Sequence, residues 1–151
     1  MARVLRIERG GEGLYASGLW YLATGDADSD DVHPAPWNDS ALDVLVKQAY
    51  SCEEIQEMRH SGVYPVRRWL RDHPETRFGF ESVDQIRRWI YKDCWIERMA
   101  ELGGELVTYE LKQPDFCFVG YTQVMFHGFA AVEVKREPIS VLLEMNHATT
   151  I

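Results

Sequence analysis

Cysteine is scarce in this chain of 151 residues, which holds only Cys52, Cys94 and Cys117. A disulfide framework uses paired cysteines, and the common zinc sites use cysteines only a few positions apart. These three residues stand far from one another in the sequence and leave one over from any pairing. The spacing therefore favours neither kind of site, and the expected compartment is the reducing cytoplasm.

Long apolar runs are also missing. No stretch approaches the roughly 18–20 apolar residues that a membrane-crossing helix requires. The first residues place charges on both sides of a very short apolar stretch, which is unlike a secretory signal peptide. At 46% hydrophobic and 26% charged residues, the composition is typical of a soluble globular protein. The length predicts a single domain over residues 1–151 that acts away from membranes.

Basic residues are absent between Arg9 and Lys47, and the charge of the chain is uneven. Residues 1–58 carry a net charge of −7 and residues 59–98 one of +3, within a total of −8. Such a balance disfavours direct binding to nucleic acid or anionic lipid, where phosphate neutralisation supplies the affinity. It suits docking on a basic partner surface, although acidic proteins are also common in the cytoplasm.

The short motifs of the common enzyme classes are missing too. The chain has no GxxxxGK(S/T), HExxH, GxSxG or CxxC sequence, so it lacks the usual phosphate loop, zinc-protease helix, serine elbow and redox pair. Its five histidines never stand at metal-ligand spacing from one another. The sequence therefore predicts no metal centre and holds no complete enzymatic signature.

Hydrophobic periodicity predicts an α+β fold. Strands are expected near residues 4–8, 78–80, 106–111, 116–119, 123–126, 130–134 and 139–143, with short extended pieces at 14–17 and 19–22. Capping patterns predict helices that begin at Ser40, Ser51 and Ser82, and a shorter one over 66–70. We expect the helix over 82–102 to be the longest. Helices in the middle and strands towards the end predict a central, mainly antiparallel sheet.

The loop from His33 to Asp39 concentrates groups that can bind a ligand. It holds an imidazole, the indole of Trp37 and a carboxylate, and two prolines would stiffen it. We expect this loop to border the principal pocket, because rigidly held loops often carry binding residues. The alternative is a surface turn in which Asp39 or Ser40 caps the next helix.

Arginines gather in the middle of the chain. Arg71 and Arg77 flank Pro74 and are the better candidates for a phosphate contact. Arg87 and Arg88 are expected on a solvated helix face, because the apolar stripe of their helix points elsewhere.

The order of several segments resembles ADP-ribosyltransferase-like domains. Arg6 lies on the first strand, Phe80-Glu81-Ser82 opens a helix, and Gln123-Val-Met-Phe precedes Ala131-Val-Glu-Val. In that family an Arg or His on the first strand holds NAD, and a serine at a strand end braces the nicotinamide pocket. A glutamate ahead of a late strand stabilises the oxocarbenium-like transition state. The resemblance implies this fold and NAD as the cofactor, with Arg6, Ser82 and Gln123 in those three positions.

Gln123 departs from the family pattern, because glutamine lacks the negative charge of the expected glutamate. If Gln123 does not catalyse, an acid such as Glu81 or Asp39 would have to. The resemblance thus implies Gln123 and Glu81 as catalytic candidates, and Arg6, Tyr15, Ser82, His33 and Asp39 as NAD-binding ones. We expect the Gln123 side chain to point into the cleft; the alternative is an ordinary strand-edge residue that faces solvent.

The same segments, with His-Pro-x-Pro and Tyr-Glu-Leu, also resemble small proteins encoded by bacteriophages, which implies the host cytoplasm as the setting. Three hypotheses remain open. The first is an ADP-ribosyltransferase-like domain that binds NAD or ADP-ribose and modifies a host or defence protein. The second is an acidic, non-enzymatic inhibitor of the anti-CRISPR type, which covers a basic surface of its target. The third is a nucleotide-sensing domain that keeps the pocket without the chemistry.

Overall fold

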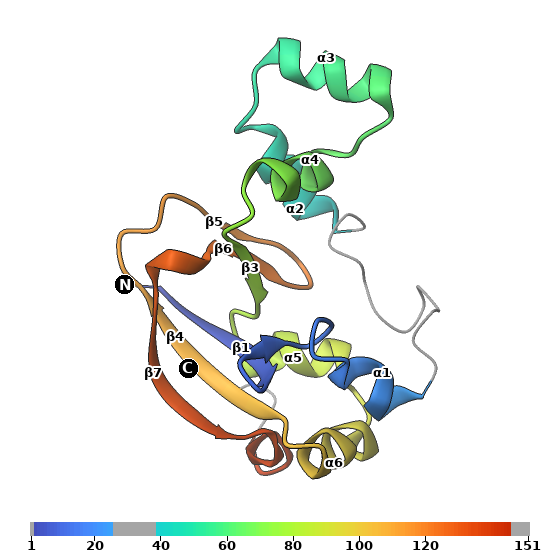
Figure 1. Ribbon diagram of the computed structural model, residues 1–151, viewed down its shortest axis with the longest axis vertical. Helices are drawn as coiled ribbons and strands as arrows, with labels where there is room; N and C mark the ends of the chain where they lie inside the picture. Colours follow the sequence, from blue (N-terminus) through green and yellow to red (C-terminus); the bar gives the residue numbers. More distant parts are fainter. Residues whose placement is uncertain (1, 26–38, 146–151) are drawn as a thin grey trace.

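The computed structural model describes residues 2–25 and 39–145, which form two antiparallel sheets and six α-helices (Figure 1). The first sheet has the strand order β2-β1-β4-β7. These strands are β1 (Arg3–Arg9), β2 (Glu12–Gly13), β4 (Glu105–Leu111) and β7 (Ala131–Pro138). The predicted α+β class is confirmed, and every strand pairing in the described ranges is antiparallel.

The second sheet has the order β3-β6-β5, and one β-bridge within the described residues joins it to the first. Its strands are β3 (Thr76–Gly79), β5 (Cys117–Val119) and β6 (Val124–His127). Leu5 of β1 and Phe80 exchange two main-chain hydrogen bonds of 2.7 Å, which join the sheets. A Cβ on Gly79 would lie 2.5 Å from the carbonyl oxygen of Leu5, so only glycine permits this approach. The prediction of one central sheet is therefore corrected to two.

The helices gather at the two ends of the molecule (Figure 1). They are α1 (Leu19–Thr24), α2 (Ser40–Lys47), α3 (Cys52–Ser61), α4 (Pro65–Asp72), α5 (Val83–Trp89) and α6 (Asp93–Glu101). Helices α2, α3 and α4 lie together at one end, and α1, α5 and α6 at the other. No helix of the described residues has the length and apolarity needed to cross a membrane.

Alternation along β1 directs its side chains to two different environments. Leu5 and Ile7 belong to the largest hydrophobic cluster, which packs against α1, α5 and α6. Side chains alternate across a strand, so Val4, Arg6 and Glu8 face the other side. Val4 packs there against β6, while Arg6 and Glu8 are polar. This second face of β1 leads to the cavity described below.

The predicted long helix over 82–102 is wrong, because the chain leaves the helical conformation at Ile90 (φ −105°, ψ 74°). Helix α5 ends at Trp89 and α6 begins at Asp93. Ile90 is fully buried, and an ion pair between Arg87 and Asp93 spans the break. Arg87 is therefore buried rather than on the solvated face expected for it.

Three other segments also differ from the prediction. Residues 14–17, expected to be extended, form turns. Residues 19–22, expected to be extended, lie in helix α1, where Leu19 and Trp20 are both completely buried. Residues 139–143, expected to be a strand, form a 3₁₀ helix. Ile139 and Leu142 are its buried residues, and their spacing of three suits a 3₁₀ turn, whereas a strand would alternate by two.

Candidate functional site

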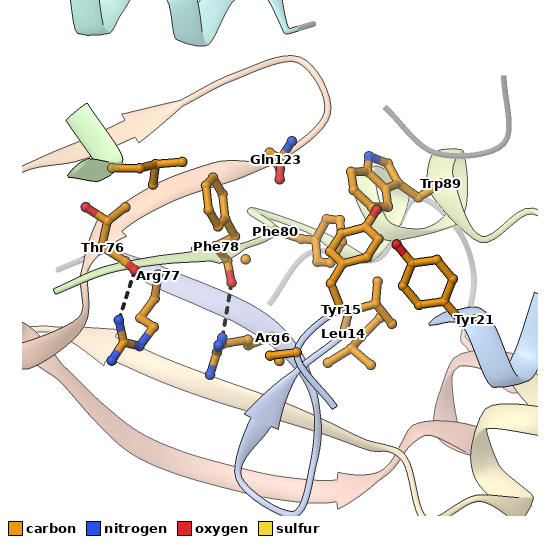
Figure 2. Close-up of a pocket in the computed structure, with 15 residues that line it drawn as sticks. Arg6, Leu14, Tyr15, Tyr21, Thr76, Arg77, Phe78, Phe80, Trp89 and Gln123 are labelled. Atoms are coloured by element: carbon orange, nitrogen blue, oxygen red, sulfur yellow. Dashed lines mark hydrogen bonds between the residues drawn. The ribbon is translucent and has the colours of Figure 1, made fainter. Parts of the chain in front are cut away.

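A cavity of about 430 Å³ opens beside β1, β3 and the residue that precedes β6 (Figure 2). Most of its lining is apolar or aromatic, and Leu14, Phe78 and Phe80 are examples. Its polar lining includes Arg6, Arg77 and Gln123. A largely apolar cleft with a few convergent polar groups is the usual form of a small-molecule site.

Arg6 is fixed by contacts on several sides. Its Nε donates a hydrogen bond of 3.2 Å to the carbonyl oxygen of Phe78, and its Nη1 one of 3.0 Å to Glu8 (Figure 2 shows the first). A Cβ on Gly13 would lie 2.6 Å from the Nη2 atom, so the guanidinium packs directly on the backbone of this glycine. These contacts hold the Arg6 guanidinium at the cavity wall.

Glu8 anchors Arg6 from the interior and is only 1% exposed. It accepts hydrogen bonds from Arg6, from the Tyr109 hydroxyl at 2.5 Å and from Arg136 Nη2 at 3.1 Å. Burial and the hydrogen bond to Glu8 raise the pKa of Tyr109 to about 12. Sequence reasoning missed Glu8, because only the pairing of β1 with β4 and of β4 with β7 brings its partners together.

Aromatic rings form the end of the cavity opposite the arginines (Figure 2). The centroid of the Tyr15 ring lies 5.8 Å from that of Trp89 and 6.5 Å from that of Tyr21. Phe80 meets Trp89 edge-on, with centroids 5.6 Å apart. Burial raises the pKa of Tyr15 above its ordinary value. This end presents flat apolar surface suited to a planar ring.

Gln123 lies between these two ends, directly before β6 (Figure 2). Its side chain is 3% exposed, so the alternative of a solvent-facing edge residue is wrong. The Nε2 atom is buried and has no hydrogen-bond partner among the described residues. Most buried polar groups are hydrogen-bonded, and an exception within a cavity calls for an explanation such as a ligand.

The turn before Gln123 is clamped from two directions. Asp39 accepts hydrogen bonds from the main-chain nitrogens of Tyr121 (3.2 Å) and Thr122 (2.8 Å) and from the Thr122 hydroxyl (2.9 Å). From the other side, Gln85 Nε2 donates to the carbonyl oxygens of Gly120 (3.2 Å) and Tyr121 (3.3 Å). Two helices, α2 and α5, thereby fix the position from which Gln123 enters the cavity.

Asp39 also caps α2 through the main-chain nitrogens of Ala41 and Leu42, both at 3.1 Å. It is 2% exposed and does not line the cavity. The alternative that Asp39 caps the next helix is therefore confirmed, and its carboxylate also braces the turn before Gln123. A Cβ on Gly120 would lie 2.4 Å from Asp39 Oδ2, which shows how closely the turn and the carboxylate pack.

The other predicted site residues fall into two groups. Arg6, Tyr15 and Gln123 line the cavity together, and Arg77 joins them. Ser82 does not line it; its hydroxyl accepts a hydrogen bond of 3.1 Å from the Gln85 nitrogen and caps α5. Glu81 is exposed and also outside the lining, which is a poor position for a catalytic acid.

His33 lies outside the described residues, so the predicted loop is represented here by Asp39 alone. Within residues 2–25 and 39–145, no three histidine, cysteine, aspartate or glutamate side chains are placed to share a metal ion. The chemistry of the described cavity therefore consists of cationic donors, an amide and aromatic rings.

A comparison with protein families matches residues 1–140 to the family described as Bacteriophage T4 Y00F protein. No curated protein and no solved structure matches the chain. The resemblance to phage-encoded proteins is thereby confirmed, whereas the resemblance to ADP-ribosyltransferases gains no support from these comparisons. Because the match spans nearly the whole length, the chain belongs to the bacteriophage T4 Y00F protein family.

Proposed function

We propose that this protein binds NAD or ADP-ribose in the cavity between Arg6, Tyr15 and Gln123 and acts on a host or defence protein. One observation carries the proposal. Arg6 and Gln123 are 117 positions apart, both were matched to positions of the NAD site in the family, and both line the same cavity together with Tyr15, whereas the third matched residue, Ser82, does not. The fold class alone would support no such statement, because one fold serves many functions.

The distribution of chemistry in the cavity suits a nucleotide. Arginines bind phosphate oxygens through charge-assisted hydrogen bonds, and Arg6 and Arg77 stand together at one end. Tyr15 and Tyr21 offer ring surface to a base at the other end. The Gln123 amide between them can donate to a ribose hydroxyl or to an acceptor on the base.

The likeness to ADP-ribosyltransferases is weaker at the catalytic position than at the NAD-binding positions. No carboxylate of the described residues lines the cavity. The neutral amide of Gln123 cannot offset the positive charge that develops on the ribose when nicotinamide leaves. We therefore propose binding with little turnover. Gln123→Glu should increase nicotinamide release, since the amide nitrogen that it replaces has no described partner to lose.

Thermal-shift measurements with NAD and ADP-ribose test the proposal. A ligand at 100 times its Kd stabilises the folded protein by about 2.7 kcal/mol. Arg77→Gln should weaken that stabilisation, and Arg98→Gln is the matched control, because Arg98 is an exposed arginine of α6 that does not line the cavity. Labelled NAD with host extract then measures transfer and nicotinamide release for the native chain and for Gln123→Glu.

If neither nucleotide stabilises the native protein, the proposal is wrong. The acidic-inhibitor hypothesis then becomes the better one, and a pull-down from host lysate across a range of salt concentrations would test it.

A further inference from the structure

We infer that Thr76 and Trp89 are further ligand-binding residues, one at each end of the cavity, and that together they orient the bound nucleotide. The Thr76 hydroxyl donates to a phosphate oxygen, and the Trp89 indole nitrogen donates to an acceptor atom on the planar ring of the ligand. The inference rests on the proposed function and adds the direction in which the nucleotide lies. Neither residue was among the candidates that the sequence offered.

Three buried side chains of the cavity wall have a polar atom without a hydrogen-bond partner among the described residues. These atoms are the Thr76 hydroxyl, the Gln123 amide nitrogen and the Trp89 indole nitrogen. The three residues are 7%, 3% and 2% exposed. A buried polar group without a partner costs free energy, and each of these three can donate a hydrogen bond. Their presence in one cavity indicates a ligand that carries acceptor atoms at several positions.

Thr76 belongs to the end of the cavity that holds the arginines (Figure 2). Its carbonyl oxygen accepts a hydrogen bond of 3.0 Å from Arg77 Nη1. Two residues further along β3, the carbonyl oxygen of Phe78 accepts one of 3.2 Å from Arg6 Nε. Both guanidinium groups are therefore held beside the strand that carries the Thr76 hydroxyl. A hydroxyl near two guanidinium groups is suited to a phosphate, whose oxygens accept hydrogen bonds from all of them.

Trp89 belongs to the aromatic end, where its ring neighbours leave the indole nitrogen without an acceptor. The ring centroids of Tyr15, Trp20 and Phe80 lie 5.8, 6.1 and 5.6 Å from that of Trp89. Phenylalanine has no acceptor atom and an indole only donates, and no hydrogen bond joins the Trp89 nitrogen to the Tyr15 hydroxyl. Tyr21, 48% exposed, adds an accessible ring to this wall. A ligand ring packed against the two tyrosines can present an acceptor at its edge to the indole nitrogen.

Two rings of the proposed ligands carry such an acceptor. Adenine has ring nitrogens that accept hydrogen bonds, and nicotinamide has a carboxamide oxygen. The shared chemistry is a planar ring with an acceptor at its edge. ADP-ribose contains adenine alone, whereas NAD contains both rings, so these two ligands distinguish the sources.

Calorimetric titration of two variants with ADP-ribose and NAD tests the inference. Thr76→Val keeps the branched side chain and Trp89→Phe keeps an aromatic ring, so each chiefly removes a donor that has no described partner. Thr76→Val should weaken the binding of both ligands by about three- to tenfold, the effect of one hydrogen bond. Trp89→Phe should weaken NAD binding by a similar factor. An equal loss for ADP-ribose identifies the ring as adenine, and a loss for NAD alone identifies it as nicotinamide.

Trp69→Phe is the matched control. Trp69 is also a buried tryptophan whose indole nitrogen has no described partner, but it does not line the cavity. This variant should bind both ligands with the affinity of the native protein. A loss equal to that of Trp89→Phe would overturn the inference, because it would show that the effect does not depend on the cavity.

Inorganic pyrophosphate, which has no ring, tests the orientation. At millimolar concentration it should displace ADP-ribose from the native protein. Thr76→Val should weaken this competition, and Trp89→Phe should leave the affinity for pyrophosphate unchanged. Equal losses of pyrophosphate affinity in the two variants would overturn the orientation.

The remaining outcomes separate the inference from the proposed function. Native affinity for both nucleotides in Thr76→Val or in Trp89→Phe, with the fold intact by circular dichroism, would overturn the inference and leave nucleotide binding in place. Failure of the native protein to bind either ADP-ribose or NAD would instead refute the proposed function.

Discussion

Two buried polar side chains near the cavity, Glu8 and Gln123, differ in whether their polar atoms are hydrogen-bonded. Glu8 is 1% exposed and receives three hydrogen bonds from side chains of β1, β4 and β7. Gln123 is 3% exposed, and its amide nitrogen has no described partner. A satisfied buried group stabilises the fold, whereas an unsatisfied one costs stability that a ligand can restore. The comparison predicts that changes at Glu8 affect stability and changes at Gln123 affect binding.

Glu8→Ala should have the largest effect on stability. It leaves Arg6, Arg136 and Tyr109 without their shared acceptor, and breaking a buried ion pair costs about 3–5 kcal/mol. Chemical denaturation followed by circular dichroism measures the loss. Glu12→Ala, at an exposed position of β2, is the control and should change the free energy of unfolding little. A loss below about 1 kcal/mol at Glu8 would show that the network is weak.

Asp39→Ala should follow, with a loss of about 2–4 kcal/mol, because it removes both the cap of α2 and charge-assisted bonds to the turn. The variant should also weaken ADP-ribose binding, since the released turn carries Gln123. Ser40→Ala, at the next and exposed position, tests whether any change in this segment has the same effect. Normal nucleotide affinity in a folded Asp39→Ala variant would contradict the positioning role of Asp39.

Gln123→Met tests whether Gln123 contributes to ligand binding rather than to stability. The variant keeps the length of the side chain and removes an amide whose nitrogen has no described partner, so the free energy of unfolding should change by less than about 1 kcal/mol. ADP-ribose affinity should nevertheless fall. A large loss of stability without a loss of affinity would reverse the roles assigned to Gln123 and Glu8.

The last prediction concerns the dependence of stability on pH. The folded state raises the pKa of Tyr109 to about 12 from an ordinary value of 10, mainly through burial and then through the hydrogen bond to Glu8. A raised tyrosine pKa contributes stability below pH 10 that is lost as the pH rises towards 12. Tyr109→Phe should therefore weaken the dependence of unfolding free energy on pH in that window. Parallel slopes for the two proteins would contradict this contribution.

Local patterns in the sequence were enough for much of the fold. Ser51 and Glu54 form the capping box that their spacing indicates, and the alternation over 106–111 corresponds to β4. Two failures share one feature. Ile90 leaves the helix and Ile139 joins a 3₁₀ turn, and both residues are completely buried in the core. Tertiary packing overrides local periodicity at such positions.

The candidate site was predictable only in part. Arg6 and Gln123 could be chosen as site residues from the sequence, because a resemblance to a family is found along the chain and requires no three-dimensional contacts. The roles of Asp39 and Glu8 depend on contacts across 83 and 128 residues, to Thr122 and Arg136. Periodicity carries no information at that separation. The sequence therefore offered the capping of α2 by Asp39 as an alternative but gave no sign that Asp39 braces the turn, and Glu8 was missed.

The proposed function requires that the buried amide of Gln123 contacts a bound nucleotide. The most direct measurement is a ¹⁵N–¹H NMR titration of the side-chain amides with ADP-ribose, in which the Gln123 signals are identified by their absence from Gln123→Glu. We expect these signals to shift as ADP-ribose approaches saturation, while those of exposed Gln48 stay in place. Gln123 amide signals that do not move at saturating ADP-ribose would contradict it.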